Sequence, residues 1–396
     1  MLITAANIYV AQTGYRRAVI LEIETDAGIS GIGEVGIAYG AGTQAAAAMA
    51  EEMLARFVIG KDPSRIELIW NTIYDVSFWT KGGSAIAMAG LSGIEHALWD
   101  IKGKALGVPV YELFGGAVTD QLPVYANGWW NTCRTDDDYA AAAEATVARG
   151  YRGLKYYPLG EHDPDTVIRH PSRRRAADDI DARVYERIAK IRERVGDRID
   201  ILLDFGGGLT SDQLARILRR IEPLNITFVE EPVDPGLPRA LELISRKTSI
   251  PLAAGERHYT RYGIHPILES GAVSIVQPDI CNTGGLLEGR KIAALAEIYN
   301  ARVAPHNYGS ALATVISAQL SACIPNFMVL ECFPDFDKEP GFEPVIDDPL
   351  EPQVRDGLMP LPAGPGLGAR LSDTMRASSL WARIEPEARR ESVGFG

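Results

Sequence analysis

The chain has few cysteines, and their spacing disfavours two common uses of that residue. There are four in 396 residues, Cys133, Cys281, Cys323 and Cys332, and no two of them have the CxxC spacing. Neither a zinc knuckle nor a disulfide framework is therefore indicated, because both need thiols at characteristic spacings. We expect reduced thiols and a cytoplasmic protein.

Long apolar runs and an excess of positive charge are also absent. No uninterrupted apolar run approaches the length that spans a membrane, and residues 1–4 do not begin a basic segment followed by an apolar one. Export and membrane insertion are therefore not expected. The formal net charge of −12 gives no support for binding nucleic acid or an anionic membrane. We expect instead a small anionic substrate, bound where a metal ion supplies local positive charge.

The residues that are present are typical of a globular protein with one small and one large domain. Apolar residues make up 46% of the chain and charged residues 23%. Residues 19–34 predict a β-hairpin, and residues 43–106 are rich in helix formers. Pro and Gly residues within 108–123 then mark a boundary, and Val124 starts a new strand. We therefore predict a small α+β domain over residues 1–122.

A repeating pattern of apolar runs and acids follows later in the chain. Asp204, Glu230 and Glu256 each follow an apolar run, and both intervals between them are 26 residues. A strand, a loop, a helix and a returning loop need about that many residues, so the pattern predicts consecutive βα units. Because parallel strands end at the same rim, we expect the three carboxylates to converge there.

Converging carboxylates repel one another, and a hard divalent cation with oxygen ligands relieves that repulsion. We therefore predict one Mg²⁺ per site, held by Asp204, Glu230 and Glu256. Acids at strand ends also cap the helices that follow, and for any single acid this structural role is common. The equal spacing of all three acids favours the metal site.

The same periodicity continues to residue 331. Asp279, His306 and Glu331 end the next three apolar runs, at steps of 23, 27 and 25 residues from the third acid. Charged and polar side chains at successive strand ends predict a parallel barrel over residues 123–350, with its chemistry at one rim. The segment 351–396 is rich in Pro and Gly, and we predict that it packs back on the small domain.

A short strand at residues 153–158 precedes these units, with Lys155 and Tyr157 on the same face. Between Lys155 and the first spaced acid lie 49 residues, much more than the later intervals. The excess, around residues 160–180, contains an arginine run at 173–175. Such a run favours a solvated surface loop. A lid that recognises a carboxylate is the alternative hypothesis.

Several motifs beside the three acids carry a family resemblance. They are residues 24–34, residues 97–109, the segments 255–257 and 277–279, and His306. Together with the spaced acids they make nearly the whole chain resemble the enolase superfamily, in its mandelate racemase-like subgroup. That resemblance implies an α+β capping domain over a modified TIM barrel, (β/α)7β, and commonly a homo-oligomer.

The resemblance also implies a chemistry. Members of the family abstract the proton α to a carboxylate and form an enediolate, beside a Mg²⁺ that the three acids hold. By this resemblance His306, hydrogen-bonded to Asp279, is the base, and Lys155 adds a second cation near the developing charge. A protonated Glu331 donates a hydrogen bond to the substrate carboxylate. A buried histidine satisfied by an acid is the structural alternative, and the metal pattern disfavours it.

Two departures from the family pattern bear on the reaction. The second lysine of the family's Lys-x-Lys strand is Tyr157 here, and Gly206 stands where relatives carry Asn or a catalytic His. A two-base racemase needs a base on each face, and Tyr157, with an ordinary pKa of about 10, is a poor one. Dehydration needs one proton abstraction and an acid for the departing hydroxyl, which His306, Tyr157 or a water supplies. The balance favours an acid-sugar dehydratase.

Three other functions stay open at this point. The main alternative is an isomerase, either a racemase or epimerase of a carboxylate or a lactone cycloisomerase. A Schiff-base aldolase that uses Lys155 is another, and a barrel without catalytic activity is the third.

The residues that set substrate specificity are the hardest to place from sequence. Lys155 and Glu331 are expected to bind the substrate. Further candidates are polar and aromatic residues near turns of the small domain or at the end of the first barrel strand: Tyr15, Arg16, Tyr39, Trp79, Trp129 and Trp130. Aromatic residues of this kind are more often packing residues than ligand contacts.

Overall fold

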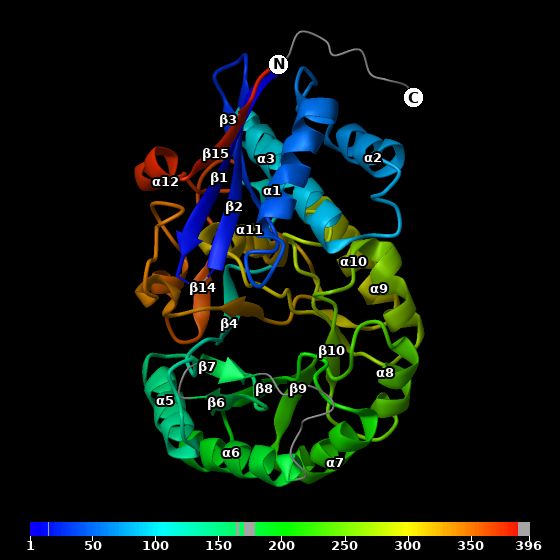
Figure 1. Ribbon diagram of the computed structural model, residues 1–396, viewed down its shortest axis with the longest axis vertical. Coiled ribbons are helices and arrows are strands. Elements are labelled where there is room, and N and C mark those ends of the chain that lie inside the picture. Colours follow the sequence, from blue (N-terminus) through cyan, green and yellow to red (C-terminus); the bar gives the residue numbers. More distant parts are fainter. Residues whose placement is uncertain (15, 164–165, 170–178, 387–396) are drawn as a thin grey trace.

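The computed structural model describes residues 1–14, 16–163, 166–169 and 179–386. Figure 1 shows an upper α+β domain and a barrel below it. The upper domain contains a four-stranded antiparallel sheet in the order β15-β1-β2-β3. Its strands are β1 (Ile3–Thr13), β2 (Arg16–Thr25), β3 (Ser30–Val35) and β15 (Leu380–Ile384). The pairing of β2 with β3 confirms the predicted hairpin.

Helices cover one side of this sheet. They are α1 (Thr43–Met53), the π-helical turn Leu54–Val58, α2 (Ile66–Val76), α3 (Ala85–Leu106) and α4 (Val110–Leu113). Helix α3 lies directly on β3 because two glycines of that strand have no side chain. A Cβ on Gly31 would lie 2.1 Å from the carbonyl oxygen of Ala97, and one on Gly33 would lie 2.0 Å from that of Gly93. The glycines of this segment therefore serve close packing between helix and strand.

The lower domain is a parallel barrel. Its strands are β4 (Gln121–Ala126), β5 (Gly153–Tyr156), β8 (Asp200–Asp204), β9 (Ile226–Glu230), β10 (Leu252–Ala254), β11 (Ile275–Val276), β12 (Arg302–Val303) and β13 (Leu330–Cys332). They pair in that order, with β13 beside β4. The ring closes where Val303 forms a parallel bridge with Phe327, next to β13.

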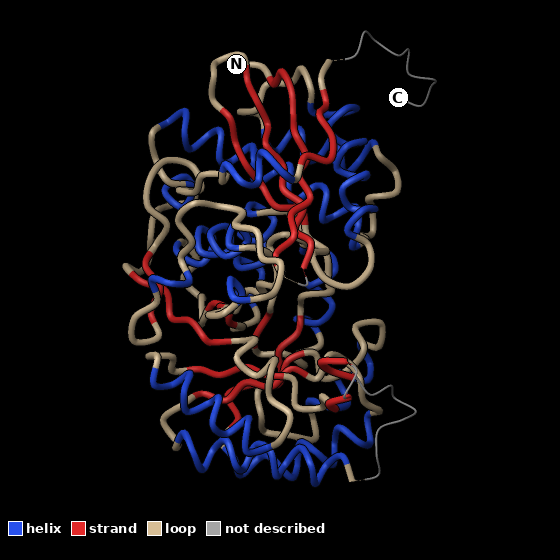
Figure 2. Tube along the Cα trace, turned by 60° about the vertical axis from the view of Figure 1, so that its left-hand side comes forward, coloured by secondary structure: helices blue, strands red, loops and turns tan. Residues whose placement is uncertain are grey.

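Helices connect successive strands and form the outer layer, which Figure 2 shows at the periphery. They are α5 (Asp136–Ala148), α6 (Ile180–Val195), α7 (Ser211–Ile221), α8 (Pro238–Ser245), α9 (Thr260–Glu269), α10 (Leu286–Ile298) and α11 (Ala311–Ala322). Short 3-10 turns are Glu222–Leu224, Phe336–Lys338 and Glu351–Gln353. The order of elements confirms the predicted capping domain and (β/α)7β barrel.

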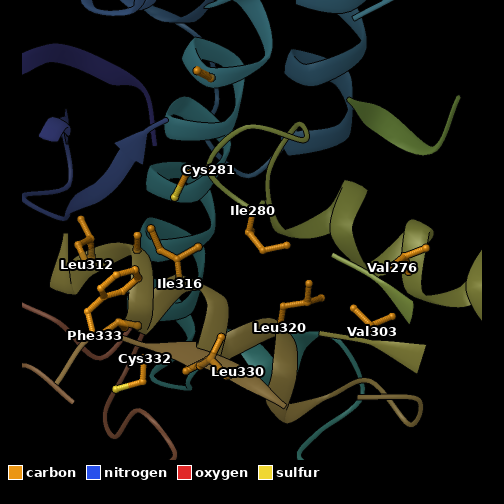
Figure 3. Close-up of a cluster of buried hydrophobic side chains, with 14 of the residues drawn as sticks. Val276, Ile280, Cys281, Val303, Leu312, Ile316, Leu320, Leu330, Cys332 and Phe333 are labelled. Carbon is orange, nitrogen blue, oxygen red and sulfur yellow. The ribbon is translucent and has the colours of Figure 1, made fainter. Parts of the chain in front are cut away.

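Apolar side chains fill the barrel on both sides of its strands. An inner layer consists of Tyr125, Leu202, Phe228, Ala253, Ile275 and Ala304, which are at most 1% exposed. Figure 3 shows part of the outer layer, where the strand residues Val276, Val303 and Leu330 pack beside Leu312, Ile316 and Leu320 of α11. Because the interior is filled, a substrate can enter only at an end of the barrel.

The chain leaves the barrel and returns to the upper domain. The elements of this segment are β14 (Leu358–Pro360), α12 (Asp373–Ser378) and β15. Strand β14 pairs with β4 of the barrel, and β15 pairs with β1 of the upper sheet. The predicted divisions between residues 122 and 123 and between 350 and 351 stay predictions.

The long insertion after β5 contains a two-stranded ribbon, β6 (Glu161–Asp163) and β7 (Thr166–Arg169), paired in antiparallel fashion. The arginine run at 173–175 lies outside the described residues. Whether residues 160–180 form a lid or a surface loop therefore stays a prediction.

Candidate active site

A cavity of about 920 Å³ lies at the carboxyl ends of the barrel strands, between the barrel and the capping domain. This is the size of a small-molecule site. Residues of both domains line it, and the barrel contributes seven of those predicted to carry the chemistry: Lys155, Tyr157, Asp204, Glu256, Asp279, His306 and Glu331. Glu230 does not line the cavity and is fully buried.

The three predicted metal ligands lie on neighbouring strands. Asp204 ends β8 and Glu230 ends β9, where the two are directly paired in the strand register. Glu256 follows the next strand, β10. Burial raises the pKa of all three carboxyls, although the cations Lys155 and His306 oppose this effect. Neighbouring acids raise these pKa values further, as expected for a group that needs a cation.

In this arrangement, protein groups hold all three acids. Asp204 Oδ1 accepts from the backbone N–H of Gly206 at 2.8 Å. Lys155 Nζ lies 2.9 and 2.7 Å from the two carboxylate oxygens of Glu230, and Gln277 Nε2 donates to Glu230 at 2.7 Å. Glu256 Oε2 lies 3.2 Å from His306 Nε2. Within the described ranges, no three His, Cys, Asp or Glu side chains already surround a point where a metal ion could sit. The structure brings the acids to one rim, but their side chains are not arranged as a finished ligand cage.

Lys155 is a buried cation between two acids, because its Nζ also lies 2.7 Å from Glu331 Oε1. Burial disfavours its charge, but Glu230 and Glu331 outweigh burial and raise the pKa of Lys155 well above its ordinary value. For Glu331, burial raises the pKa, but Lys155 and His306 outweigh burial and lower the pKa of that carboxyl below its ordinary value. The adjacent cation thus favours the ionised form of Glu331 rather than the protonated form, and the role of Glu331 toward the substrate stays a prediction.

His306 and Asp279 form the predicted pair. His306 Nδ1 lies 2.7 Å from Asp279 Oδ2, and the other oxygen of Asp279 accepts from the backbone N–H of Cys281 at 2.8 Å. Burial lowers the pKa of His306, but Glu256 and the hydrogen bond that His306 donates to Asp279 raise it well above its ordinary value. A carboxylate at Nδ1 leaves Nε2 as the nitrogen that exchanges protons with a substrate.

The two departures from the family pattern, Tyr157 and Gly206, lie in contact. A Cβ on Gly206 would lie 3.5 Å from Tyr157 Cε2, and the backbone of Gly206 has a φ of +54°. That conformation disfavours any residue with a side chain. Burial raises the pKa of Tyr157, so the residue is a phenol rather than a phenolate. The ring of Tyr157 thus occupies space beside the position where relatives carry a side chain.

The structure corrects the expectation for Arg16. This residue is 2% exposed and does not line the cavity. Its guanidinium packs about 5 Å from the ring centroids of Tyr308 and Phe333, two residues that do line it. Nη1 donates to the carbonyl oxygen of Gly309 at 2.8 Å. Arg16 therefore supports the cavity wall without forming part of it. The rings of Tyr308 and Phe333, rather than the guanidinium, face the cavity.

Trp79 also differs from the expectation. It lies in the exposed loop between α2 and α3, is 81% exposed, and does not line the cavity. Its ring contacts that of Phe78, at a centroid distance of 5.0 Å. The loop turns outward after α2, and Phe78 has a φ of +59°. Tyr15, another candidate of the small domain, lies outside the described residues.

Other aromatic candidates lie closer to the cavity. Tyr39 lines it from the capping domain, and its ring meets that of Tyr308 edge to face at 5.3 Å. Trp130 lines the cavity from the side of the barrel. Trp129 does not line the cavity, but its Nε1 donates to the carbonyl oxygen of Lys155 at 2.9 Å and so orients that strand.

Sequence reasoning missed several polar residues of the cavity, among them Asn127 and Arg257. Asn127, directly after β4, donates through Nδ2 to Glu331 at 2.7 Å and accepts from Trp130 Nε1 at 3.0 Å. The rule that found the acids, a polar residue at a strand end, could have found Asn127 as well. Arg257 lines the cavity and is held by buried Glu231, with Nε 2.8 Å from its carboxylate. Only the fold shows that pairing.

The fold and the charged residues at the carboxyl ends of the barrel strands together define a barrel enzyme with a capping domain. Residues 4–115 match the family model of the mandelate racemase / muconate lactonizing enzyme N-terminal domain. Residues 138–375 match the model described as enolase C-terminal domain-like. The chain therefore belongs to the mandelate racemase / muconate lactonizing enzyme family and is an enzyme of the enolase superfamily.

Relatives in sequence and in structure agree with this family. A D-galactonate dehydratase of Variovorax paradoxus is 41% identical over 293 residues, which cover 73% of this chain and 71% of that protein. A provisionally assigned dehydratase from Mesorhizobium loti has a TM-score of 0.94 at 47% identity, over 97% of this chain and 100% of that one. An enolase superfamily member from Salmonella Typhimurium has a TM-score of 0.89 at 34% identity, over 97% and 99%. Within the ranges that the structure describes, no helix combines the length and apolar character needed to cross a membrane.

Proposed function

We propose that this protein is a Mg²⁺-dependent acid-sugar dehydratase, which converts a 2,3-dihydroxy acid into a 2-keto-3-deoxy acid and water. The observation that carries the proposal is that the His306–Asp279 pair lines the same cavity as Lys155, Asp204 and Glu256. The names of the D-galactonate dehydratases at about 40% identity support the class of substrate. D-galactonate is therefore the first compound to test.

The chemistry of the donor set fits Mg²⁺, which prefers carboxylate oxygens. Asp204, Glu230 and Glu256 would hold the ion, since they lie on three neighbouring strands and burial raises the pKa of each. Binding requires that Glu230 share its carboxylate with Lys155 and that Glu256 turn from His306. When bound, Mg²⁺ supplies positive charge for the oxygens of a substrate carboxylate as the adjacent carbon loses its proton.

His306 is the proposed base. Only the neutral imidazole is a base, so His306 must first lose its contact with Glu256, the largest of the effects that raise its pKa. Its Nε2 then removes the proton from C2, while Asp279 fixes the tautomer of the imidazole and stabilises the imidazolium that forms. The electron pair of the C2–H bond moves toward the carboxylate, returns to form the C2–C3 double bond, and the C3 hydroxyl leaves. Protonated His306 or the phenol of Tyr157 gives that hydroxyl the proton it needs to leave as water. The resulting enol tautomerises to the 2-keto-3-deoxy acid, and water is the second product.

Two observations weigh against the other functions. A Schiff-base aldolase needs a neutral lysine, whereas Glu230 and Glu331 keep Lys155 charged. A two-base racemase needs a second base, whereas burial raises the pKa of Tyr157, so that its phenol is a poor source of the phenolate that would act as a base. Both observations favour dehydration.

The test is turnover in D₂O with Mg²⁺, followed by NMR, on D-galactonate and then on a stereochemically complete set of acid sugars. The expected product is a 2-keto-3-deoxy acid that carries deuterium, and EDTA should abolish its formation. A product with unchanged mass apart from deuterium supports isomerisation and overturns the dehydratase proposal. Failure of every acid sugar overturns it too. Borohydride trapping of substrate, together with activity in EDTA, supports the aldolase.

We also propose that the protein is a cytoplasmic homo-oligomer. The support is the reduced, widely spaced thiols and the resemblance to a family whose barrels commonly assemble. Light scattering coupled to size-exclusion chromatography measures the oligomeric state directly, and a monomeric mass contradicts that part of the proposal.

A further inference from the structure

Two buried acids of the capping domain take no part in the chemistry proposed above. Glu34 lies in β3 and Glu95 lies in α3, and each is 1% exposed. Carboxylates are rarely buried unless they have strong hydrogen-bond partners. In both cases the partners are in the other domain, at the first residues of a barrel helix.

Glu95 binds the beginning of α10. Its Oε2 accepts from the backbone N–H of Leu286 at 2.8 Å, and its Oε1 accepts from that of Leu287 at 2.9 Å. Trp99 Nε1 donates to Oε1 at 2.7 Å and orients the carboxylate from its own helix. The first N–H groups of a helix have no partners inside the helix, so a carboxylate there acts as its cap. Helix α10 is therefore capped by the capping domain.

Glu34 binds the beginning of α11 in the same way. Its Oε1 accepts from the backbone N–H of Ser310 at 2.8 Å, and its Oε2 accepts from the Ser310 hydroxyl at 2.5 Å. Ser310 is the N-cap residue of α11, and its hydroxyl accepts from the N–H of Leu312 at 3.1 Å. Glu34 thus holds the residue that caps the helix.

A glycine makes room for each acid. A Cβ on Gly285 would lie 2.2 Å from Glu95 Oε2, and one on Gly309 would lie 2.5 Å from Glu34 Oε1. Any side chain at these two positions would displace the carboxylate. The same arrangement, a buried acid beside a glycine at a helix start, therefore occurs twice between the two domains.

The two capped helices follow the two strands that carry the proposed base and its partner. Asp279 precedes the first residue of α10 by seven positions, and His306 precedes the first residue of α11 by five. Asp279 and His306 are themselves joined by a parallel bridge. Figure 3 shows Ile280 and Cys281, the residues that follow Asp279, beside the cluster that α11 joins.

Further capping-domain contacts hold the same segments. His96, next to Glu95, lies with Nε2 3.1 Å from the carbonyl oxygen of Ile280. The backbone N–H of Gly36 donates to the carbonyl oxygen of Cys281 at 3.0 Å. Trp70 Nε1 donates to the carbonyl oxygen of Gly284 at 2.8 Å. The loop after Asp279 is thus bound by the capping domain along most of its length.

We propose that Glu34 and Glu95 are positioning residues for the His306–Asp279 pair, so that the capping domain aligns the base as well as covering the cavity. This inference rests on the proposed function. Glu95 does not line the cavity, and Glu34, which does, has both carboxylate oxygens bonded to Ser310. Their role is to hold the ends of the two loops on which the base and its partner are mounted.

Two variants weaken these contacts without changing the cavity wall, because neither residue lines it. Glu95→Gln replaces one of the two acceptor oxygens by an amide nitrogen, which cannot accept from a backbone N–H at the start of α10. Ser310→Ala removes the hydroxyl that donates to Glu34. Matched controls are Glu351→Gln, a buried barrel acid that bonds Thr314 of α11, and Ser372→Ala, an N-cap serine of α12.

For Glu95→Gln we expect kcat to fall about 10- to 100-fold, because a base displaced by about 1 Å loses that much. Ser310→Ala should lose less, and KM and Mg²⁺ affinity should stay within about threefold of the unmodified protein in both variants. The controls should keep kcat. A rise in KM with unchanged kcat would assign these acids to substrate binding, and a lower melting temperature with unchanged kcat would assign them to stability alone. Either result overturns the proposal.

An NMR readout separates failure of this inference from failure of the proposed function. The imidazole signals of the six histidines are recorded, and His306 is assigned from its loss in His306→Asn. In Glu95→Gln the His306 signals and their pH titration should shift, whereas in Glu351→Gln they should not. Shifted signals without turnover on any acid sugar support the positioning role and contradict the proposal that the protein is a dehydratase. Unshifted signals with undiminished turnover contradict the positioning role and leave the dehydratase proposal unaffected.

Discussion

The two halves of the barrel rim are held in different ways. On one side, the contacts of Asp204, Glu230 and Glu256 come from other barrel residues such as Lys155 and Gln277. On the other side, the loops that follow β11 and β12 are held by a separate domain, through Glu95 and Glu34. The acid half is thus completed within one sheet, whereas the half with the base depends on how two domains meet.

The separation along the chain shows the difference. Glu95 and Leu286 are 191 residues apart, and Glu34 and Ser310 are 276 residues apart. Asp204 and Glu230 are paired on adjacent strands that one helix connects. The lesson is that the proposed metal site and the proposed base can be weakened separately.

The largest effect is expected from Asp204→Asn, which removes a carboxylate from the acid half. Activity should fall at least about 10³-fold, and the rise in melting temperature that Mg²⁺ causes should disappear. Asp200→Asn is the control, since it changes an exposed acid at the start of the same strand. Undiminished activity in the Asp204 variant, measured with and without EDTA, would contradict the metal assignment.

His306→Asn tests the other half, and activity should fall about 10²- to 10⁴-fold because the general base is lost. Mg²⁺ binding, measured by calorimetry, should be preserved, since the base is not a proposed ligand. The control is His265→Asn, a half-buried histidine of α9 that bonds Tyr299. Loss of Mg²⁺ binding in the His306 variant would show that the two halves are not independent.

Gly206→Ala tests the contact between Gly206 and Tyr157. A side chain at a φ of +54° should destabilise the fold by about 1–2 kcal/mol, and the added Cβ meets the ring of Tyr157. Gly271→Ala is the matched control, because Gly271 has a φ of +64° with nothing within 4 Å of its Cβ. Chemical denaturation should show similar losses for both, and kcat/KM should fall only for Gly206→Ala. Equal kcat/KM in the two variants would contradict a role for this contact.

The smallest effect concerns Glu351, which burial gives a pKa of about 7 in the folded protein. Because the folded protein binds this proton more tightly than the unfolded chain, Glu351 contributes stability that is fully present below its ordinary pKa of about 4.5. This contribution is lost as pH rises through about 7. For Glu351→Gln we expect a flatter dependence of unfolding free energy on pH between these values. The difference should be on the order of 3 kcal/mol at most. Urea titrations at pH 5 and pH 8, with Glu52→Gln as an exposed control, measure it.

The parts of the site that sequence reasoning found share one property. Asp204, Glu230 and His306 all end apolar runs, and a strand end in a parallel barrel has a known location. The structure departs from expectation at Arg16 and Glu331, and in both cases the departure concerns the neighbours of the residue rather than its position. The aromatic rings beside Arg16 and the lysine beside Glu331 come from other parts of the chain, so no local pattern indicates them.

The sequence alone determined the two-domain architecture, the order of barrel units and the rim to which the acids belong. The physical reason is that strand and helix periodicity is local, and its repetition places equivalent residues at equivalent ends. The tertiary structure decided which charges meet, that Lys155 pairs with Glu331, that Tyr157 lies beside Gly206, and that Glu34 and Glu95 reach the loops of His306 and Asp279. Those outcomes depend on distances between segments up to 276 residues apart, and only folding sets such distances.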